Sequence, residues 1–340
     1  MSPFDVFKSD LFSATSLSAA VDKISYTPGF LGGLGIFSPT PVRTTDVWIE
    51  ERDFTPSLVP ITPRGGAPTQ VGGDARKGRN FRTRRIGAAS TIMADELQNI
   101  RQFGSETDLK SLSDELARRQ FKLITDLELT MEFFRMGAVQ GVFADPSGGN
   151  VYDWSTEFSQ APGSDSAIDF TAYTAGEWRE KCAGIKRAIV RGLKGRQAGQ
   201  IVALCGDAFW DAMVKCQEVR DSYLGTPFAD ALRGDSAWNY GGVEWFDFGG
   251  IRWTNYRGTD DNSTVAVGDE KAYLFPTGAG IFQQIMGPGE SFDQVNQLGQ
   301  QWLSNMILDN DRNRYVSLEV YSYPLFVCLM PGALYTLQLD

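Results

Sequence analysis

The chain has 340 residues, 42% of them hydrophobic and 12% aromatic, and its formal net charge is −10. These values exclude a mostly disordered protein, and the length predicts two lobes, or one lobe with long excursions, built from both helices and strands. The negative charge argues against a protein that grips nucleic acid with its whole surface, because phosphate binding needs a broad cationic footprint.

The first 45 residues are predicted to form an extended arm. They show little hydrophobic periodicity, and glycine and proline recur between Pro28 and Pro41. The glycines of 29–35 lack a preceding strand and a G-x-G-x-x-G pattern, so no phosphate-binding loop is expected there. No basic segment followed by an apolar run opens the chain, so no secretory signal is expected and synthesis should end in the cytoplasm.

Strand-like residues at 45–61 and again near 81–86 predict a long hairpin. Between Arg64 and Arg85 the only acid is Asp74, and the basic residues are Arg64, Arg76, Lys77, Arg79, Arg82, Arg84 and Arg85. Three interpretations are open: a solvated loop, an arm that docks on an acidic neighbour, and a nucleic-acid hook. The hook ranks third because no aromatic residues interleave with the arginines as stacking platforms.

Residues 105–141 are predicted to form one long helix. Its apolar side chains recur at steps of three, four or seven: Leu109, Leu112, Leu116, Leu123, Leu127, Met131, Phe134 and Ala138. Ser105 and Asp108 suit a capping box, and at 1.5 Å per residue the helix spans roughly 50 Å. Opposite charges four residues apart, such as Lys122 and Asp126, predict a solvated outer face.

A second lobe is predicted to follow a polar connection at 144–176. It begins with a helix at 176–195, a buried strand at 201–204 and a helix at 207–218. Further short strands are expected at 243–248, 251–256, 264–268, 272–275, 302–308, 315–323, 325–329 and 334–339. The uncharged stretch 320–339 is long enough to cross a membrane, but prolines and a glycine interrupt it, so we expect two strands instead.

Catalytic and metal-binding patterns are weak. The chain has no histidine, which removes histidine-based nucleophile activation and every histidine-containing zinc site. No catalytic residue, metal or cofactor is therefore expected. Asp309 and Asp311 begin like a calcium loop, but Arg314 and Val320 occupy its glycine and glutamate positions, so a polar turn is predicted. Four cysteines without a C-x-x-C pair are expected to be reduced and mostly buried: Cys182, Cys205, Cys216 and Cys328.

Short segments in a fixed order from about residue 45 to the end carry a resemblance to a known family. In the first half they are 47–50, 58–60, 63–66, 94–104 and 130–141. In the second half they are 248–253, 272–276, 287–288, 295–299, 321–325 and Pro331. Through their order and spacing, rather than any single string, the chain resembles the lambda-type major capsid protein E family of tailed phages.

The resemblance implies an α+β protein with the Hong Kong 97-like fold. Its parts would be an N-terminal arm at 1–45, an E-loop hairpin at 46–90, a peripheral domain at 91–180 with spine helix 105–141, an axial domain at 181–299, and C-terminal strands at 300–340 that complete the peripheral domain. No long acidic helical prefix precedes the arm, so scaffolding would come from a separate protein. No credible lysine–asparagine pair is evident, so a non-covalent shell is expected.

The implied function is structural: hexamers and pentamers form an icosahedral shell of the virion around double-stranded DNA, which is not bound sequence-specifically. A scaffolding protein, a portal and a decoration protein are the implied partners, with no membrane and with assembly in the host cytoplasm. Two alternatives stay open: a nucleic-acid-binding module that uses hairpin 64–85, and a hydrolase with carboxylate chemistry.

Charge layout predicts one contact between subunits. The basic hairpin of one subunit would lie across the long helix of its neighbour, where acidic residues recur. Those acids are Glu106, Asp108, Asp114, Glu115, Asp126, Glu128 and Glu132.

Overall fold

The computed structural model describes residues 29–52, 59, 61, 64–65, 76–94, 96, 105–224, 244–256, 259, 265–312 and 314–340. In the long helix the side chains are described from residue 116 onward. The start of the predicted arm, 1–28, and most of the outer part of the predicted hairpin, 53–75, lie outside these residues.

The predicted long helix is confirmed as α5 (Ser105–Gln140). From residue 116 onward the predicted apolar stripe is buried: Leu116, Leu123, Leu127, Met131, Phe134 and Ala138. Gly141, which follows the helix, has a φ of +84°, a left-handed conformation that glycine adopts without strain. The helix therefore ends where its sequence predicts, with one face inside the protein.

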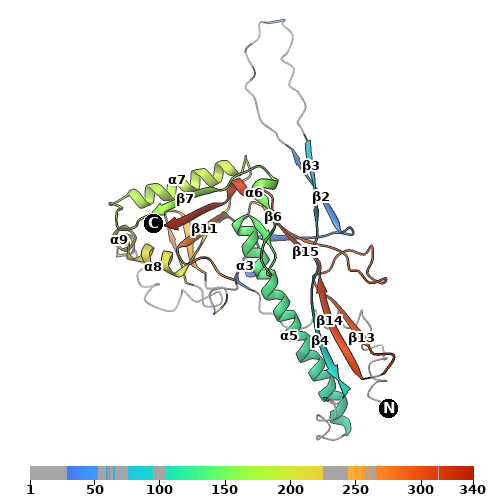
Figure 1. Cartoon of the computed structure of the whole chain (residues 1–340). Helices are drawn as coiled ribbons and strands as arrows, with labels where there is room; N and C mark the ends of the chain where they lie inside the picture. Colours follow the sequence, from blue (N-terminus) through green and yellow to red (C-terminus); the bar gives the residue numbers. More distant parts are fainter. Residues whose placement is uncertain are drawn as a thin grey trace.

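A three-stranded antiparallel sheet runs beside α5 in the order β13 (Leu303–Leu308), β14 (Tyr315–Ser322) and β4 (Ile86–Met93). Alternate residues of β14 are buried, and Leu318 and Val320 share an apolar cluster with Leu123 of α5. This alternation is the period-2 pattern of a strand with one face on a core. Helix and sheet together form the elongated lobe in Figure 1.

The root of the hairpin is confirmed as an antiparallel ribbon of β2 (Asp46–Arg52) and β3 (Arg76–Arg82). Figure 1 shows it projecting from the body of the protein. The run near 81–86, predicted as one strand, is instead the junction where β3 ends and β4 begins. Three residues between them connect the ribbon to the sheet beside α5.

Part of the predicted arm is packed, which corrects the expectation of an extended segment. A short helix, α3 (Phe30–Gly33), is followed by β1 (Phe37–Pro41), which pairs in parallel with β12 (Phe282–Met286). β12 also pairs with β15 (Pro324–Cys328). The Phe37 ring lies 5.2 Å from that of Phe282 and 5.4 Å from that of Phe326, and this aromatic contact holds β1 in place.

The second lobe contains a six-stranded sheet, β7-β16-β11-β8-β10-β9. The strands are β7 (Gly163–Ile168), β16 (Tyr335–Leu339), β11 (Lys271–Pro276), β8 (Ile201–Cys205), β10 (Ile251–Asn255) and β9 (Trp245–Phe248). One face packs on α7 (Glu177–Gly192) and α8 (Asp207–Lys215), which α9 (Gln217–Leu224) follows. All of β8 is buried because its other face belongs to the core that contains Phe134 of α5.

Two strand predictions need correction. Residues 265–268 form no strand. The last 40 residues do not complete one sheet with the first lobe: β13 and β14 lie beside α5, β15 joins β1 and β12, and β16 inserts between β7 and β11 of the second lobe. The buried Leu337 explains this insertion, because it packs in the apolar cluster of that lobe. Elements that were not predicted include β12 and, within the predicted polar connection, β5 (Val142–Ala144), β6 (Asn150–Asp153), α6 (Trp154–Glu157) and β7, as well as the 3-10 turn Pro331–Ala333.

Candidate functional site

The ribbon is anchored to the body by one aromatic side chain. Phe81 of β3 is 2% exposed, and its ring lies 5.4 Å from Tyr152, 5.3 Å from Trp154 and 6.0 Å from Phe158. The hydroxyl of Tyr152 accepts a hydrogen bond from the N–H of Arg82 at 3.1 Å. The root of the ribbon is thus fixed by packing, while its outward part carries charges away from the core.

The predicted basic residues divide into two groups. All seven are exposed except Arg79, which is half-buried, and the first group consists of Arg64, Arg76, Lys77 and Arg82. The other three contact aromatic rings of the same chain: Arg79 lies over Phe158, Arg84 over Tyr152 and Arg85 over Tyr321. Arg85 also forms an ion pair of 3.5 Å with Glu290. The second group holds the ribbon root by cation–π contacts, which leaves the first group as the clearer candidates for a partner.

Two of the predicted acids are not on the surface, which corrects their assignment. Glu128 and Glu132 are 4% and 5% exposed, and both carboxylates pair with the guanidinium of Arg135, at 2.7 and 3.0 Å. Burial by itself lowers the pKa of Arg135, but the two carboxylates outweigh it and raise that pKa above its usual value. Both carboxylates are paired with Arg135 inside the subunit, so they cannot form ion pairs with arginines of a neighbouring subunit.

Of the remaining predicted acids, Asp126 is exposed on α5. The others belong to the first turns of the helix, whose side chains lie outside the described residues: Glu106, Asp108, Asp114 and Glu115. Their place on the backbone of α5 agrees with the prediction.

Glu132 joins three segments that are far apart in the sequence. Its carboxylate accepts hydrogen bonds from the N–H of Leu31 at 2.7 Å, the N–H of Gly32 at 3.3 Å and the hydroxyl of Tyr256 at 3.3 Å. A Cβ on Gly29 would lie 2.5 Å from this carboxylate, so a larger residue there would have to displace it from its hydrogen bonds. Burial, with the charge of Glu132 beside it, raises the pKa of Tyr256, which keeps its hydroxyl protonated as a donor. The network fixes the inner end of the arm to the long helix.

Sequence reasoning missed this network, although a signal was present. Glu128, Glu132 and Arg135 alternate with the buried Leu127, Met131 and Phe134 on one stretch of helix, so charged side chains there had to be either buried or at the border of the apolar face. Their spacings of three, four and seven residues place them within reach of one another.

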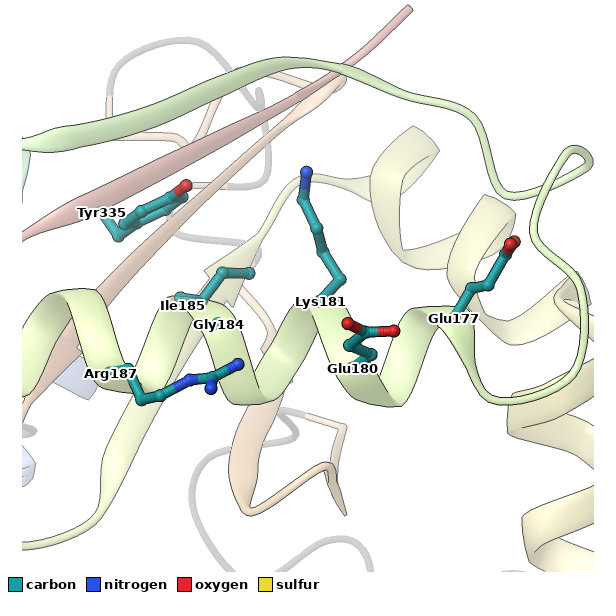
Figure 2. Close-up of a pocket in the computed structure, with 7 residues that line it drawn as sticks. All are labelled: Glu177, Glu180, Lys181, Gly184, Ile185, Arg187 and Tyr335. Atoms are coloured by element: carbon teal, nitrogen blue, oxygen red, sulfur yellow. The ribbon is translucent and has the colours of Figure 1, made fainter.

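A shallow depression of about 390 Å³ lies between α7 and β16 (Figure 2). It is lined by Glu177, Glu180, Lys181, Gly184, Ile185, Arg187 and Tyr335. Lys181 forms an ion pair with Asp165, and the hydrogen bond between them raises the pKa of the ammonium group. A lysine held in its charged form is not a nucleophile. The lining therefore gives no basis for assigning covalent catalysis to this depression.

Other chemistry-bearing groups are structural. The four cysteines are free and buried, as predicted, and burial raises the pKa of Cys182 and of Cys328 to about 12. The carboxylate of Asp309 accepts hydrogen bonds from the N–H groups of Asp311, Arg312 and Arg314, which confirms a polar turn. Within the described residues, no group of three or more acidic, cysteine or histidine side chains could hold a metal ion, and no helix is suited to cross a membrane.

Comparisons with known proteins agree on one family. A model of the family described as "Phage major capsid protein E" matches residues 13–339. The major capsid protein of Salmonella phage Felix O1 is 24% identical over 370 aligned positions, which cover 97% of this chain and 96% of that protein.

Solved capsid structures have the same fold at low identity. The mature capsid of bacteriophage PhiM1 matches with a TM-score of 0.54 at 10% identity, over 93% of this chain and 88% of that one. The capsid of cyanophage P-SCSP1u matches with a TM-score of 0.53 at 9% identity, over 93% and 90%.

Proposed function

The chain belongs to the phage major capsid protein E family, and we propose that it builds its shell as hexamers and pentamers joined by the basic ribbon. It is a major capsid protein with the Hong Kong 97-like fold, a structural component of an icosahedral phage shell in the virion. This family is one of structural proteins and not of enzymes, and a nucleic-acid-binding module is not the favoured interpretation.

The observation that carries the proposed contact is the ribbon itself. Phe81 anchors its root, yet Arg76, Lys77 and Arg82 are exposed. A projection rooted in the core and charged along its length is suited to reach a second subunit. We assign it as the E-loop, and its partner as the acidic outer side of α5 in the neighbouring subunit, including Asp126.

Further partners follow from a shell of this type. A separate scaffolding protein would take part in assembly in the host cytoplasm, and a portal and a decoration protein would be further partners. Packaged double-stranded DNA would lie inside without sequence-specific contacts.

Particle formation tests the proposed function. The chain, expressed with its scaffolding protein, should sediment as particles, tubes or rings and show them in negative-stain images. A monomer that stays monomeric at high concentration with scaffold present would contradict the proposal. Filter binding to duplex DNA should show little retention, whereas a true DNA-binding module would bind tightly at low salt and lose affinity steeply as salt rises.

A charge reversal tests the ribbon contact. Arg84 and Arg85 have contacts within the chain, so their replacement could also disturb the fold of the subunit. The test variant therefore combines Arg76→Glu, Lys77→Glu and Arg82→Glu. Each exposed ion pair contributes only about 0–1 kcal/mol, but a closed shell repeats the contact in every subunit, so the triple variant should raise the concentration needed for assembly. High salt should weaken wild-type assembly in the same direction.

A matched control changes the net charge equally at another site: Arg187→Glu, Arg191→Glu and Arg220→Glu, which are exposed on the second lobe. Circular dichroism should show both variants folded. If the ribbon variant assembles as the control does, the basic ribbon is only a solvated loop.

A further inference from the structure

Segment 290–298, between β12 and β13, presents apolar side chains that the subunit does not bury. Phe292 is fully exposed, and Val295 and Leu298 are 47% and 51% exposed. The path of the segment is nevertheless fixed. The N–H of Val295 donates to the carbonyl oxygen of Ser291 at 2.9 Å. Exposed apolar residues gathered on a defined turn mark an interaction surface rather than a flexible connection.

The body of the protein holds the segment at its middle and just beyond its end. The side chain of Gln294 donates to that of Asn305 on β13 at 3.4 Å, and the N–H of Gly299 donates to the carbonyl oxygen of Val42 at 3.0 Å. Together with the ion pair of Arg85 and Glu290, these contacts orient the turn. These contacts are hydrogen bonds and an ion pair, so they hold the turn without burying its apolar side chains, which stay exposed.

The outer side of α5 is not the fully solvated face that its charges predict. Phe121 and Leu129 are 44% and 42% exposed, and Ala117 is also exposed. Residues four apart share one side of a helix, so these three form an outward stripe with Thr125 between the two larger side chains. At 100° per residue this outward stripe is centred roughly 140° from the buried stripe, with Ala117 at the border of the buried face and Leu129 well outside it. It is a second apolar strip without a place in the described core.

The segment and the stripe do not cover each other within one subunit, because the apolar side chains of both are exposed. The inward face of α5 packs on β4 and β14, so the outward stripe faces away from that sheet. The segment instead contacts β13, at the far edge of the sheet from β4 (Figure 1). Two copies in a head-to-tail arrangement can bring the two surfaces together, and repetition of such a contact can close a ring.

Charge supports the same pairing. Asp293 is exposed beside Phe292 in the segment, and Lys122 is exposed beside Phe121 on α5. An acid next to one aromatic ring and a base next to the other would place opposite charges at the rim of an apolar contact, the usual anatomy of a protein interface.

We propose that segment 290–298 of one subunit docks on the outward stripe of α5 in a second copy of the chain. The contact rests on the proposed shell function. It differs from the ribbon contact because its centre is apolar, so salt should affect it little. The two contacts use different strips of α5, since Asp126 lies about 100° round the helix from Thr125.

Disulfide trapping tests which surfaces meet. The double variant Phe292→Cys with Phe121→Cys places new surface thiols on both sides, and the four native cysteines are buried. A disulfide needs Cα atoms about 4.4–6.8 Å apart, so oxidised particles should give a ladder of covalent multimers on a denaturing gel. Each single variant can give dimers at most. The pair Leu298→Cys with Leu129→Cys is a second test of the same register.

Monomer bands from oxidised particles of both pairs would overturn the proposal and assign the stripe to another occupant, such as residues 1–28 or a decoration protein. An independent readout is Phe292→Ser, which should raise the concentration needed for assembly on the order of tenfold at both low and high salt. The matched control is Val190→Ser, a change of an exposed apolar residue on α7, which should assemble like wild type.

Assembly of Phe292→Ser at the wild-type concentration would also refute the docking contact. Circular dichroism establishes that each variant is folded. If the wild-type chain itself forms no particles with scaffold present, the proposed function fails before any variant is compared, so the two failures are distinguishable.

Discussion

Removal of the Glu132 carboxylate should destabilise the subunit strongly. In Glu132→Ala the N–H groups of Leu31 and Gly32 and the hydroxyl of Tyr256 lose their acceptor, and Arg135 keeps only Glu128. Arg135 stays paired with Glu128, so the main cost is that three buried donors lose their acceptor. Each such donor costs about 1–3 kcal/mol, and the lower part of that range gives about 3–5 kcal/mol in total. We expect a loss of this size in the free energy of unfolding.

The expected shift in melting temperature follows from the chain length. With an unfolding entropy of about 2.1 cal/mol/K per residue, a chain of 340 residues loses about 4–7 °C for 3–5 kcal/mol. Calorimetry of assembled particles measures this shift. Hydrogen exchange supplies a local readout, since the amide of Leu31 should be protected in the wild type and exchange quickly in the variant.

Two further variants separate charge from hydrogen bonding. Glu132→Gln keeps an acceptor for the N–H of Leu31 but removes the charge. Its free energy of unfolding should therefore lie between that of the wild type and that of Glu132→Ala. Asp126→Ala removes an exposed acid from the same helix and should change stability by less than about 1 kcal/mol. A melting temperature for Glu132→Ala within 1 °C of the wild type would refute the assigned role of the network.

Two other predictions concern packing and pH. Phe81→Ala should lower the free energy of unfolding by about 3–5 kcal/mol, because it leaves a cavity among Tyr152, Trp154 and Phe158. Urea denaturation measures this loss. A midpoint equal to that of the wild type would show that the ribbon root is not packed. Burial raises the pKa of Cys182 and Cys328 to about 12, so the folded thiols should resist iodoacetamide at pH 8. Rapid alkylation of the native protein would contradict the burial of these thiols. In the unfolded chain the same thiols lose their protons from about pH 9, so the free energy of unfolding should fall as pH rises from about 9 towards 12.

Local pattern was enough to predict the elements whose residues repeat with one period. The buried stripe of α5 has helical spacing over many turns, so its length and inward face could be predicted before any contact was known. The same holds for α7, β8 and the root of the β2–β3 ribbon. The family resemblance, spread over most of the chain, then ordered these elements into the Hong Kong 97-like fold.

Pairings between distant segments could not be predicted, because periodicity contains no information on which strand a given strand meets. β1 pairs in parallel with β12, about 240 residues away, and β16 inserts between β7 and β11. Phe37 and Leu337 decide these positions through the cores they enter, and a core exists only once several segments have come together.

The sequence by itself determined that α5 is long and amphipathic, that the ribbon is basic and that the subunit is a capsid protein. Only the tertiary structure decided which charges are exposed. Glu132 looks like Asp126 in the sequence, yet one accepts hydrogen bonds from the arm inside the protein and the other is exposed on α5. The physical reason is that burial of a charge depends on partners about 100 residues away, which supply the donors that compensate its loss of water.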